Sequence, residues 1–198
     1  MEELLNYSLT RTVAPASEPL TTAEAKTHLN IAASDTSHDS YVAALIQKAR
    51  EQVEHDSGMA LITQTWTHVS DDFEDYGDGI QLTRRPIQSI TSIVYKDNAG
   101  TATTLPTSVY ALDAARQRIL LKYNQLWPTV RGDWDAVTIT YVAGFGDNAS
   151  SVPMLAKQCM LLLIGYDFEN RDMLANETIY NRKAYEDLVI RLARSSYP

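Results

Sequence analysis

The hydrophobic positions of this chain change their spacing twice, from a helical period to strict alternation and back to a helical period. A shared three- or four-residue spacing between positions 38 and 58 predicts an amphipathic helix with the apolar residues Val42, Leu45, Ile46, Ala49 and Val53. Gly58 follows this segment as a predicted C-terminal stop. A shorter helix is predicted to begin before it, because Thr21 precedes Glu24 by the three residues of a capping box.

From about residue 60 the pattern becomes that of β-strands. In LITQTWTHVS, from residue 61 onward, β-branched and aromatic side chains alternate with polar ones. SITSIVYKDNAGTATTL is read as two strands joined by a turn at residues 97–100, where Gly100 tolerates positive φ. With SVYALD, RILL and AVTITYV, the sequence predicts five or six short strands.

The helical period returns after residue 152. VPMLAKQCMLLLIGYDFEN is apolar on nearly every side, which predicts a helix buried by its neighbours or by other subunits. ETIYNRKAYEDLVIRLAR has a single apolar face. The predicted fold is therefore α+β: a small α-helical bundle with an antiparallel β lobe inserted between the second and third main helices. The expected domains are an N-terminal arm with helices (1–59), the β lobe (60–146) and C-terminal helices with a tail (147–198), the last packing with 20–59 as one compact unit.

Composition narrows the class of protein. The 198 residues have a formal net charge of −8, which argues against extensive wrapping of nucleic acid, since that affinity rests on Lys and Arg. The single cysteine, Cys159, excludes an internal disulfide framework. The N-terminus has no secretory signal pattern, and the most apolar stretch, MLLLIGY, is too short to span a membrane. A soluble intracellular product is expected.

The stretch YVAGFGDNASSVP has two glycines before a predicted helix, an arrangement that some proteins use to hold phosphate. A phosphate-binding loop needs Lys and Ser or Thr directly after the last glycine, whereas Gly146 is followed by Asp147, which would repel phosphate. The favoured interpretation is a corner between strand and helix. Ser150 or Ser151 is expected to cap that helix, whose first turn holds Pro153.

No catalytic or metal-binding pattern is evident, and no cofactor is predicted. There is no G-x-S-x-G elbow, and Cys159 lies in an apolar helix, where a thiol usually behaves as a small hydrophobe. His28, His38, His55 and His68 lack metal-ligand spacing. The acidic run DDFEDYGDG fails the calcium-loop pattern at two ligand positions, which leaves a solvated loop or an acidic contact patch.

Two groups of residues are candidates for contacts with other proteins. In LTRRPIQSI, Arg84 and Arg85 precede a proline at a strand entrance, where they either keep a sheet edge soluble or bind a partner. Together with Trp127 they form the candidate interface set. Arg191 and Arg194 lie near the end of the last predicted helix, where the helix dipole favours cations.

Several segments, taken in order, resemble a known family. The segments that carry the resemblance are LTTAEAKTHLNI, QTW, RRPIQSITSIVY, AVTITYVAGFGD and LLLIGYDFENRD. The chain resembles the head–tail connector (adaptor) family of tailed double-stranded-DNA phages, which includes prophage and gene-transfer-agent relatives. The resemblance extends from about Leu20 to Met173.

The resemblance implies a structural, non-enzymatic virion protein of the neck, assembled in the host cytoplasm. Such adaptors form a homo-oligomeric ring, usually dodecameric, beneath the portal protein. The ring extends the DNA channel and presents a platform to a stopper or tail protein. The family's C-terminal segment reaches the portal, which implies portal contacts for Arg191, Arg194 and Tyr197. The acidic balance suits a channel through which DNA passes without tight binding.

Two other classes of function remain open from the residues. One is a stopper or tail-completion protein of the same neck region. The other is an uncharacterised enzyme whose site is assembled from scattered acids such as Asp133 and Asp135.

Overall fold

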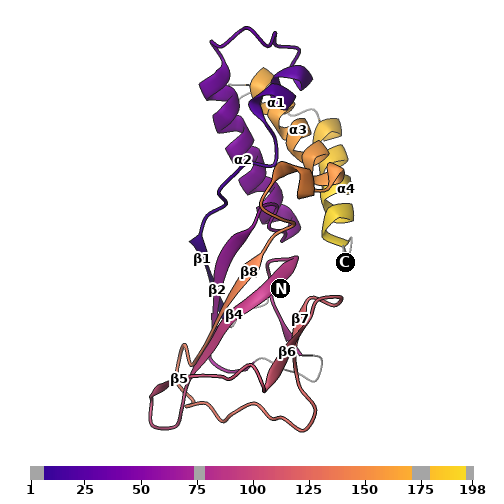
Figure 1. The fold of residues 1–198 in the computed structure, drawn as a ribbon. Helices are drawn as coiled ribbons and strands as arrows, with labels where there is room; N and C mark the ends of the chain where they lie inside the picture. The colour runs from indigo at the N-terminus through magenta and orange to yellow at the C-terminus, as the bar shows by residue number, and fades with distance from the viewer. Residues whose placement is uncertain (1–6, 74–78, 171–178, 195–198) are drawn as a thin grey trace. The chain divides into compact units, whose positions relative to one another are not determined.

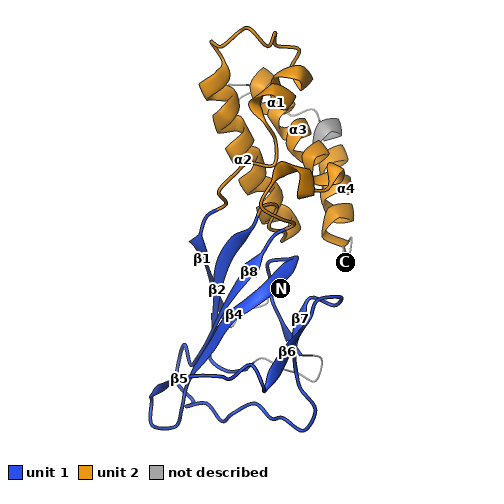
Figure 2. Ribbon diagram, viewed as in Figure 1, with its two compact units in different colours: residues 1–14, 63–144, 198 blue, residues 15–62, 145–197 orange. Residues whose placement is uncertain are grey.

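The computed structural model describes residues 7–73, 79–170 and 179–194 (Figure 1). Within these residues it contains four α-helices and antiparallel sheets, so the protein is of mixed α+β class. The chain divides into two compact units (Figure 2). The β unit consists of residues 1–14, 63–144 and 198, and the helical unit consists of residues 15–62 and 145–197.

The helical unit is built from four helices and one short 3-10 turn: α1 (Thr22–His28), α2 (Asp39–Ser57), η1 (Ala149–Ser151), α3 (Met154–Glu169) and α4 (Ile179–Arg194). Helix α2 contacts each of the other three helices, and α3 contacts both α1 and α4. The apolar side chains buried between them include Val42, Ile46, Val53, Cys159, Met160, Ile164 and Leu192. None of the helices among the described residues is long and apolar enough to cross a lipid bilayer.

The ends of α1 and α2 follow local sequence signals, as predicted. The Thr21 hydroxyl accepts a hydrogen bond from the Glu24 backbone N–H at 3.1 Å, and the Thr21 N–H donates to the Glu24 carboxylate at 2.7 Å. This reciprocal capping box satisfies two backbone donors that a helix start leaves unpaired. Helix α2 ends at Gly58, whose φ of 70° lies in the left-handed region. Both predictions are confirmed.

A buried charge network fixes the segment that follows α2. The Arg50 side chain, only 4% exposed, donates to Glu18 at 2.8 Å and to Glu54 at 3.1 Å. Glu54 in turn accepts the backbone N–H of Leu61 at 2.9 Å. These bonds compensate charges that would be costly to bury alone. Residues 59–62 therefore pack in the helical core, and the strand expected from residue 61 begins at Gln64.

The β unit contains two antiparallel sheets. Its strands are β1 (Tyr7–Val13), β2 (Gln64–Ser70), β3 (Ile80–Gln81), β4 (Ile87–Lys96), β5 (Ala102–Thr104), β6 (Tyr110–Asp113), β7 (Arg118–Leu121) and β8 (Val137–Ala143). The larger sheet has the order β1-β2-β8-β4-β5, and the smaller sheet has the order β3-β7-β6.

Buried and half-buried side chains alternate strictly along strands β2 and β8, so each strand has one buried face. In β2 and β8 every second residue is buried, as the sequence pattern predicts. Trp66 lies opposite Tyr141 and His68 opposite Ile139, so one face of the larger sheet holds two aromatic residues and a histidine. The turn predicted at residues 97–100 joins β4 to β5, and Gly100 has a φ of 82°.

Strand β1 was not predicted. Its sequence, YSLTRTV, has few apolar residues, and most of its side chains are exposed. Among the described residues, the strand pairs with β2 alone, at the edge of the larger sheet. Because an edge strand buries little surface, its sequence has little hydrophobic alternation to detect. Main-chain pairing with β2, which sequence alone does not specify, places it in the sheet.

The glycine-containing stretch after β8 forms the predicted corner between strand and helix. Gly144 and Gly146 have φ values of 143° and 151°, which L side chains rarely adopt. A Cβ atom at Gly146 would lie 2.6 Å from the Ser151 hydroxyl oxygen. The expected serine cap is wrong: Ser151 ends η1, and the N-cap of α3 is Pro153, which makes no side-chain cap. The 3-10 turn places both serines before the capping position.

Candidate functional site

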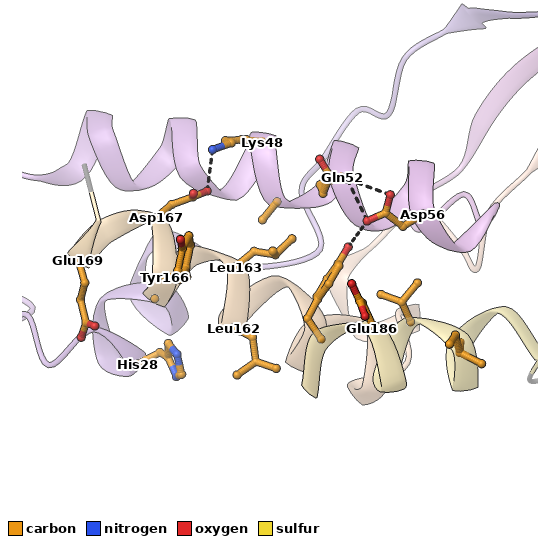
Figure 3. Close-up of a pocket in the computed structure, with 15 residues that line it drawn as sticks. His28, Lys48, Gln52, Asp56, Leu162, Leu163, Tyr166, Asp167, Glu169 and Glu186 are labelled. Carbon is orange, nitrogen blue, oxygen red and sulfur yellow. Dashed lines mark hydrogen bonds and ion pairs between the residues drawn. The ribbon is translucent and has the colours of Figure 1, made fainter. Parts of the chain in front are cut away.

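The helical unit contains an open groove of about 730 Å³ (Figure 3). All four helices contribute to it. Its lining combines aliphatic side chains with several carboxylates and comprises His28, Lys48, Ala49, Gln52, Asp56, Leu162, Leu163, Gly165, Tyr166, Asp167, Glu169, Tyr185, Glu186, Val189 and Ile190.

The apolar part of the groove comes from α3 and α4. Leu162 and Leu163 of α3 are half-buried, and Ile190 of α4 is 47% exposed. Helix α3 is apolar on nearly every side, yet only part of its circumference is covered by the other described helices. The groove is therefore the uncovered side of a helix whose sequence is suited to full burial.

Hydrogen bonds and an ion pair hold the walls of the groove in place (Figure 3). The Tyr185 hydroxyl of α4 donates to Asp56 of α2 at 2.7 Å, and the Gln52 amide donates to both Asp56 oxygens at 2.9 Å. Burial alone would raise the pKa of the Asp56 carboxyl, but these donors and the adjacent His55 outweigh burial and lower that pKa below its ordinary value. The Lys48 ammonium lies 2.9 Å from the Asp167 carboxylate and joins α2 to α3.

The charge of the groove is predominantly negative. The basic groups of its lining are Lys48 and His28, and the Lys48 charge is paired with Asp167. The acidic residues of the lining are Asp56, Asp167, Glu169 and Glu186. An apolar surface with acidic margins matches a protein surface that combines apolar and basic side chains, and it repels phosphate groups.

The residues considered for catalysis from the sequence are Cys159, Asp133 and Asp135. The Cys159 thiol lies in the core of the helical unit, where burial raises its pKa to about 11. A nucleophilic cysteine needs the opposite shift. No group of three or more potential metal ligands occurs among the described residues. Asp133 and Asp135, the acids considered for an enzyme, are both exposed, and Asp133 lies 3.7 Å from the Arg131 guanidinium.

The C-terminal candidates lie at the end of α4. Arg191 and Arg194 occupy its last turn, and both are exposed. Leu192 between them is fully buried in the helical core, which fixes the direction of the two arginines relative to the unit. Tyr197 lies outside the described residues. The portal contact assigned to these three residues stays a prediction.

The other candidate interface residues make different contacts within the β unit. The half-buried Arg84 places its guanidinium 4.9 Å from the centre of the Trp66 ring. Trp127 stacks on Phe73 with ring centres 4.7 Å apart. Arg85 is exposed. The structure thus uses Arg84 and Trp127 for internal packing, and a role of these three residues in binding remains a prediction.

The predicted acidic loop is described only in part. Residues 74–78 of DDFEDYGDG lie outside the described residues, while Asp71 and Asp72 are exposed. Sequence reasoning did not find the groove, because Asp56, Asp167 and Tyr185 come from three helices. It also did not single out Trp134, which is 83% exposed. A tryptophan between two aspartates in a segment without periodicity was the available signal.

Comparisons with known proteins agree with this architecture. The model of a family described as phage gp6-like head–tail connector proteins matches residues 20–124, just over half of the chain. A chain in the virion of a native gene transfer agent particle is similar with a TM-score of 0.75 and 22% identity. A chain in the neck of an empty gene transfer agent particle, computed with C6 symmetry, has a TM-score of 0.74 and 22% identity.

A third similar chain lies in the neck of a native gene transfer agent particle computed with C12 symmetry, with a TM-score of 0.67 and 25% identity. Each of the three similarities covers 93% of this chain and 94% of the other chain. The two at 22% identity show a shared fold. No protein of curated function matches the sequence.

Proposed function

The chain belongs to the phage gp6-like head–tail connector family, and from this premise we propose that it is the adaptor of the neck, a ring beneath the portal that extends the DNA channel and docks the stopper or tail. Membership of the family makes it a structural, non-enzymatic protein of the virion neck. The observation that carries the adaptor proposal is the acidic, apolar groove on α3, which the described helices of the chain leave open.

We propose that the helical unit is the building block of the ring and that the β lobe, residues 60–146, is an insertion between α2 and α3. The division of the chain supports this arrangement, since residues 15–62 and 145–197 form one compact unit although 82 or more residues separate them in sequence. In this arrangement the C-terminal helices from residue 147 complete a bundle begun by residues 20–59.

The groove is proposed to accept a second copy of the chain. A ring requires that one surface of each copy bind a different surface of the next copy. Half-buried leucines on α3 supply apolar area for such a contact, and the acidic margins select a basic neighbouring surface. The similar chain at 25% identity lies in a neck computed with C12 symmetry, which supports a dodecameric ring.

The basic end of α4 is proposed to meet the portal. Arg191 and Arg194 are exposed in the last helical turn, and the buried Leu192 holds that turn against the core. Tyr197, three residues beyond Arg194, is proposed to add an aromatic anchor to this contact. The portal surface that fits these residues is acidic.

Reconstitution of heads tests the adaptor proposal. Purified chain is added to DNA-filled, portal-bearing heads made without it, and attachment is measured by sedimentation and by electron microscopy of the neck. We expect the double variant Arg191→Glu, Arg194→Glu to attach at least about tenfold more weakly, because the two lost charge-assisted contacts together contribute on the order of 1.4 kcal/mol or more.

The control for this experiment is Arg116→Glu, Lys183→Glu, which changes two exposed basic residues and gives the same net charge. It is expected to attach like the wild type. If the Arg191→Glu, Arg194→Glu variant attaches as well as the control, the portal contact does not lie at the end of α4. Absence of wild-type attachment to heads would contradict the adaptor role itself.

A further inference from the structure

We propose that the loop of residues 122–135 in the β unit docks a stopper or tail protein whose contact surface has an apolar pocket bordered by Lys and Arg side chains. The proposal rests on the proposed adaptor function. The loop joins β7 to β8, and it is long for a segment without helix or strand. Three of its large apolar side chains face solvent: Tyr123 at 91%, Leu126 at 83% and Trp134 at 83% exposure.

Contacts with the rest of the β unit fix the first half of this loop. The Lys122 backbone N–H donates to the Val109 carbonyl at 2.9 Å, and its ammonium donates to the Thr107 carbonyl at 2.8 Å. Trp127 then packs inward on Phe73. The backbone around Tyr123 and Leu126 is therefore held in place at both ends.

The second half of the loop is fixed to β4 and to the end of β2. The Arg131 N–H donates to the Lys96 carbonyl at 3.0 Å, and the Lys96 ammonium donates to the Trp134 carbonyl at 3.0 Å. The Asp135 N–H donates to the Asp71 carboxylate at 3.0 Å. An exposed tryptophan on a fixed backbone can be buried by a partner at a small entropic cost, which is the property of a binding hot spot.

The charges around Trp134 select the type of partner. The loop and the segments joined to it around Trp134 have three basic side chains, Lys96, Lys122 and Arg131. They have five acidic side chains, Asp71, Asp72, Asp97, Asp133 and Asp135. The local net charge is thus 3 − 5 = −2. Base stacking on Trp134 by DNA, or contact with an anionic membrane, would bring phosphates against this negative charge. A protein surface with basic side chains around an apolar pocket is complementary instead.

The portal and the tail side require different surfaces of the adaptor. The basic end of α4 fits an acidic partner surface, whereas the acidic surroundings of Trp134 fit a basic one. Because the two surfaces have opposite charge and α4 is assigned to the portal, the loop is assigned to the stopper or tail protein.

Attachment of tails tests the assignment. Heads loaded with the full-length chain are mixed with tails released from particles made without it, and joined particles are counted by electron microscopy. We expect the variant Trp134→Ala, Leu126→Ala to join tails at least about tenfold less well. Head attachment and ring formation should not change. The matched control is Val13→Ala, which removes an apolar side chain that is 56% exposed elsewhere in the same unit.

A second variant tests the role of the negative charge beside Trp134, and hydroxyl-radical labelling tests whether the partner buries Trp134. Asp133→Lys, Asp135→Lys should also reduce joining, and most strongly at low salt, where charge attraction is least screened. In wild-type chain, hydroxyl-radical labelling of Trp134 should decrease when loaded heads join tails. Normal joining by the Trp134 and Leu126 variant, or unchanged Trp134 labelling, would overturn the inference.

The remaining outcomes separate this inference from the adaptor proposal. Loss of head attachment or of ring formation by the Trp134 and Leu126 variant would place the loop against the portal or a second copy, and either result overturns the assignment. Tighter binding of single-stranded DNA by the wild type than by this variant would make the loop a nucleic-acid surface. Failure of the wild type to join heads contradicts the adaptor role.

Discussion

At the scale of single residues, burial controls the chemistry of His68. Its imidazole lies on the buried face of strand β2 and is 1% exposed. The ring stacks on Tyr7, with ring centres 4.6 Å apart. Burial lowers the pKa of His68 to about 4 from its ordinary value of 6.5. The folded protein therefore keeps this histidine neutral at physiological pH, and protonation acts against the fold.

This shift predicts a specific dependence of stability on pH. Between pH 6.5 and about 4 the unfolded chain binds a proton at His68 that the folded chain does not, so stability falls as pH falls through that window. At 1.36 kcal/mol for each pKa unit, the full effect is about 3 kcal/mol. We expect His68→Phe, which keeps a stacked ring, to flatten this part of the stability curve measured by urea unfolding at several pH values.

The reference for this measurement is the wild-type chain, unfolded in urea at the same pH values. Equal slopes for the wild type and His68→Phe would show that His68 does not titrate abnormally.

At the scale of elements, helix α3 has one side buried in the helical core and another side that lines the open groove. One side of this helix forms the helical core through Ala156, Cys159, Met160 and Ile164, while Leu162 lines the open groove. A charge at a core position would unfold the unit, whereas a charge at a half-buried position acts mainly on whatever covers the groove.

Leu162→Asp should therefore separate folding from ring formation. We expect the monomer to remain folded with a loss of about 1–2 kcal/mol in stability and rings to be absent, because an aspartate would be buried unpaired at the contact between copies. Mass photometry measures the ring, and circular dichroism with thermal unfolding measures the fold. Gln158→Asp adds the same charge at an exposed position of α3 and should still form rings. If Leu162→Asp forms rings at the same protein concentration as the wild type, the groove is not the contact between copies.

At the scale of the whole molecule, negative charge is the dominant electrostatic property. The formal net charge is −8, from 25 acidic and 17 basic residues. Carboxylates concentrate in the groove and around Trp134. A net charge of this sign repels the phosphates of the DNA backbone.

We accordingly expect no tight binding of duplex DNA by the purified chain at physiological salt. Tight non-specific binding requires Lys and Arg to displace counterions from many phosphates, and a net charge of −8 provides no such excess. Fluorescence anisotropy with a labelled duplex at several salt concentrations measures this. A submicromolar Kd that weakens steeply as salt rises would contradict the prediction.

The sequence by itself determined the elements whose signals are local. The capping box of Thr21 and Glu24 placed the start of α1, and Gly58 placed the end of α2. Alternation identified β2 and β8, and uniform apolarity identified α3 as a helix that needs neighbours. These features depend on hydrogen bonds and side-chain periodicity within a few residues, which any fold of the chain has to satisfy.

Only the tertiary structure decided the features that join distant segments. Edge pairing with β2 made residues 7–13 a strand, and the Arg50 network drew residues 59–62 into the helical core. The groove combines Asp56 with Tyr185 across 129 positions of sequence, and Lys96 of β4 donates a hydrogen bond to the backbone carbonyl of Trp134. Such features were beyond sequence reasoning because burial and charge pairing depend on which segments meet in space, and a single sequence does not state those contacts.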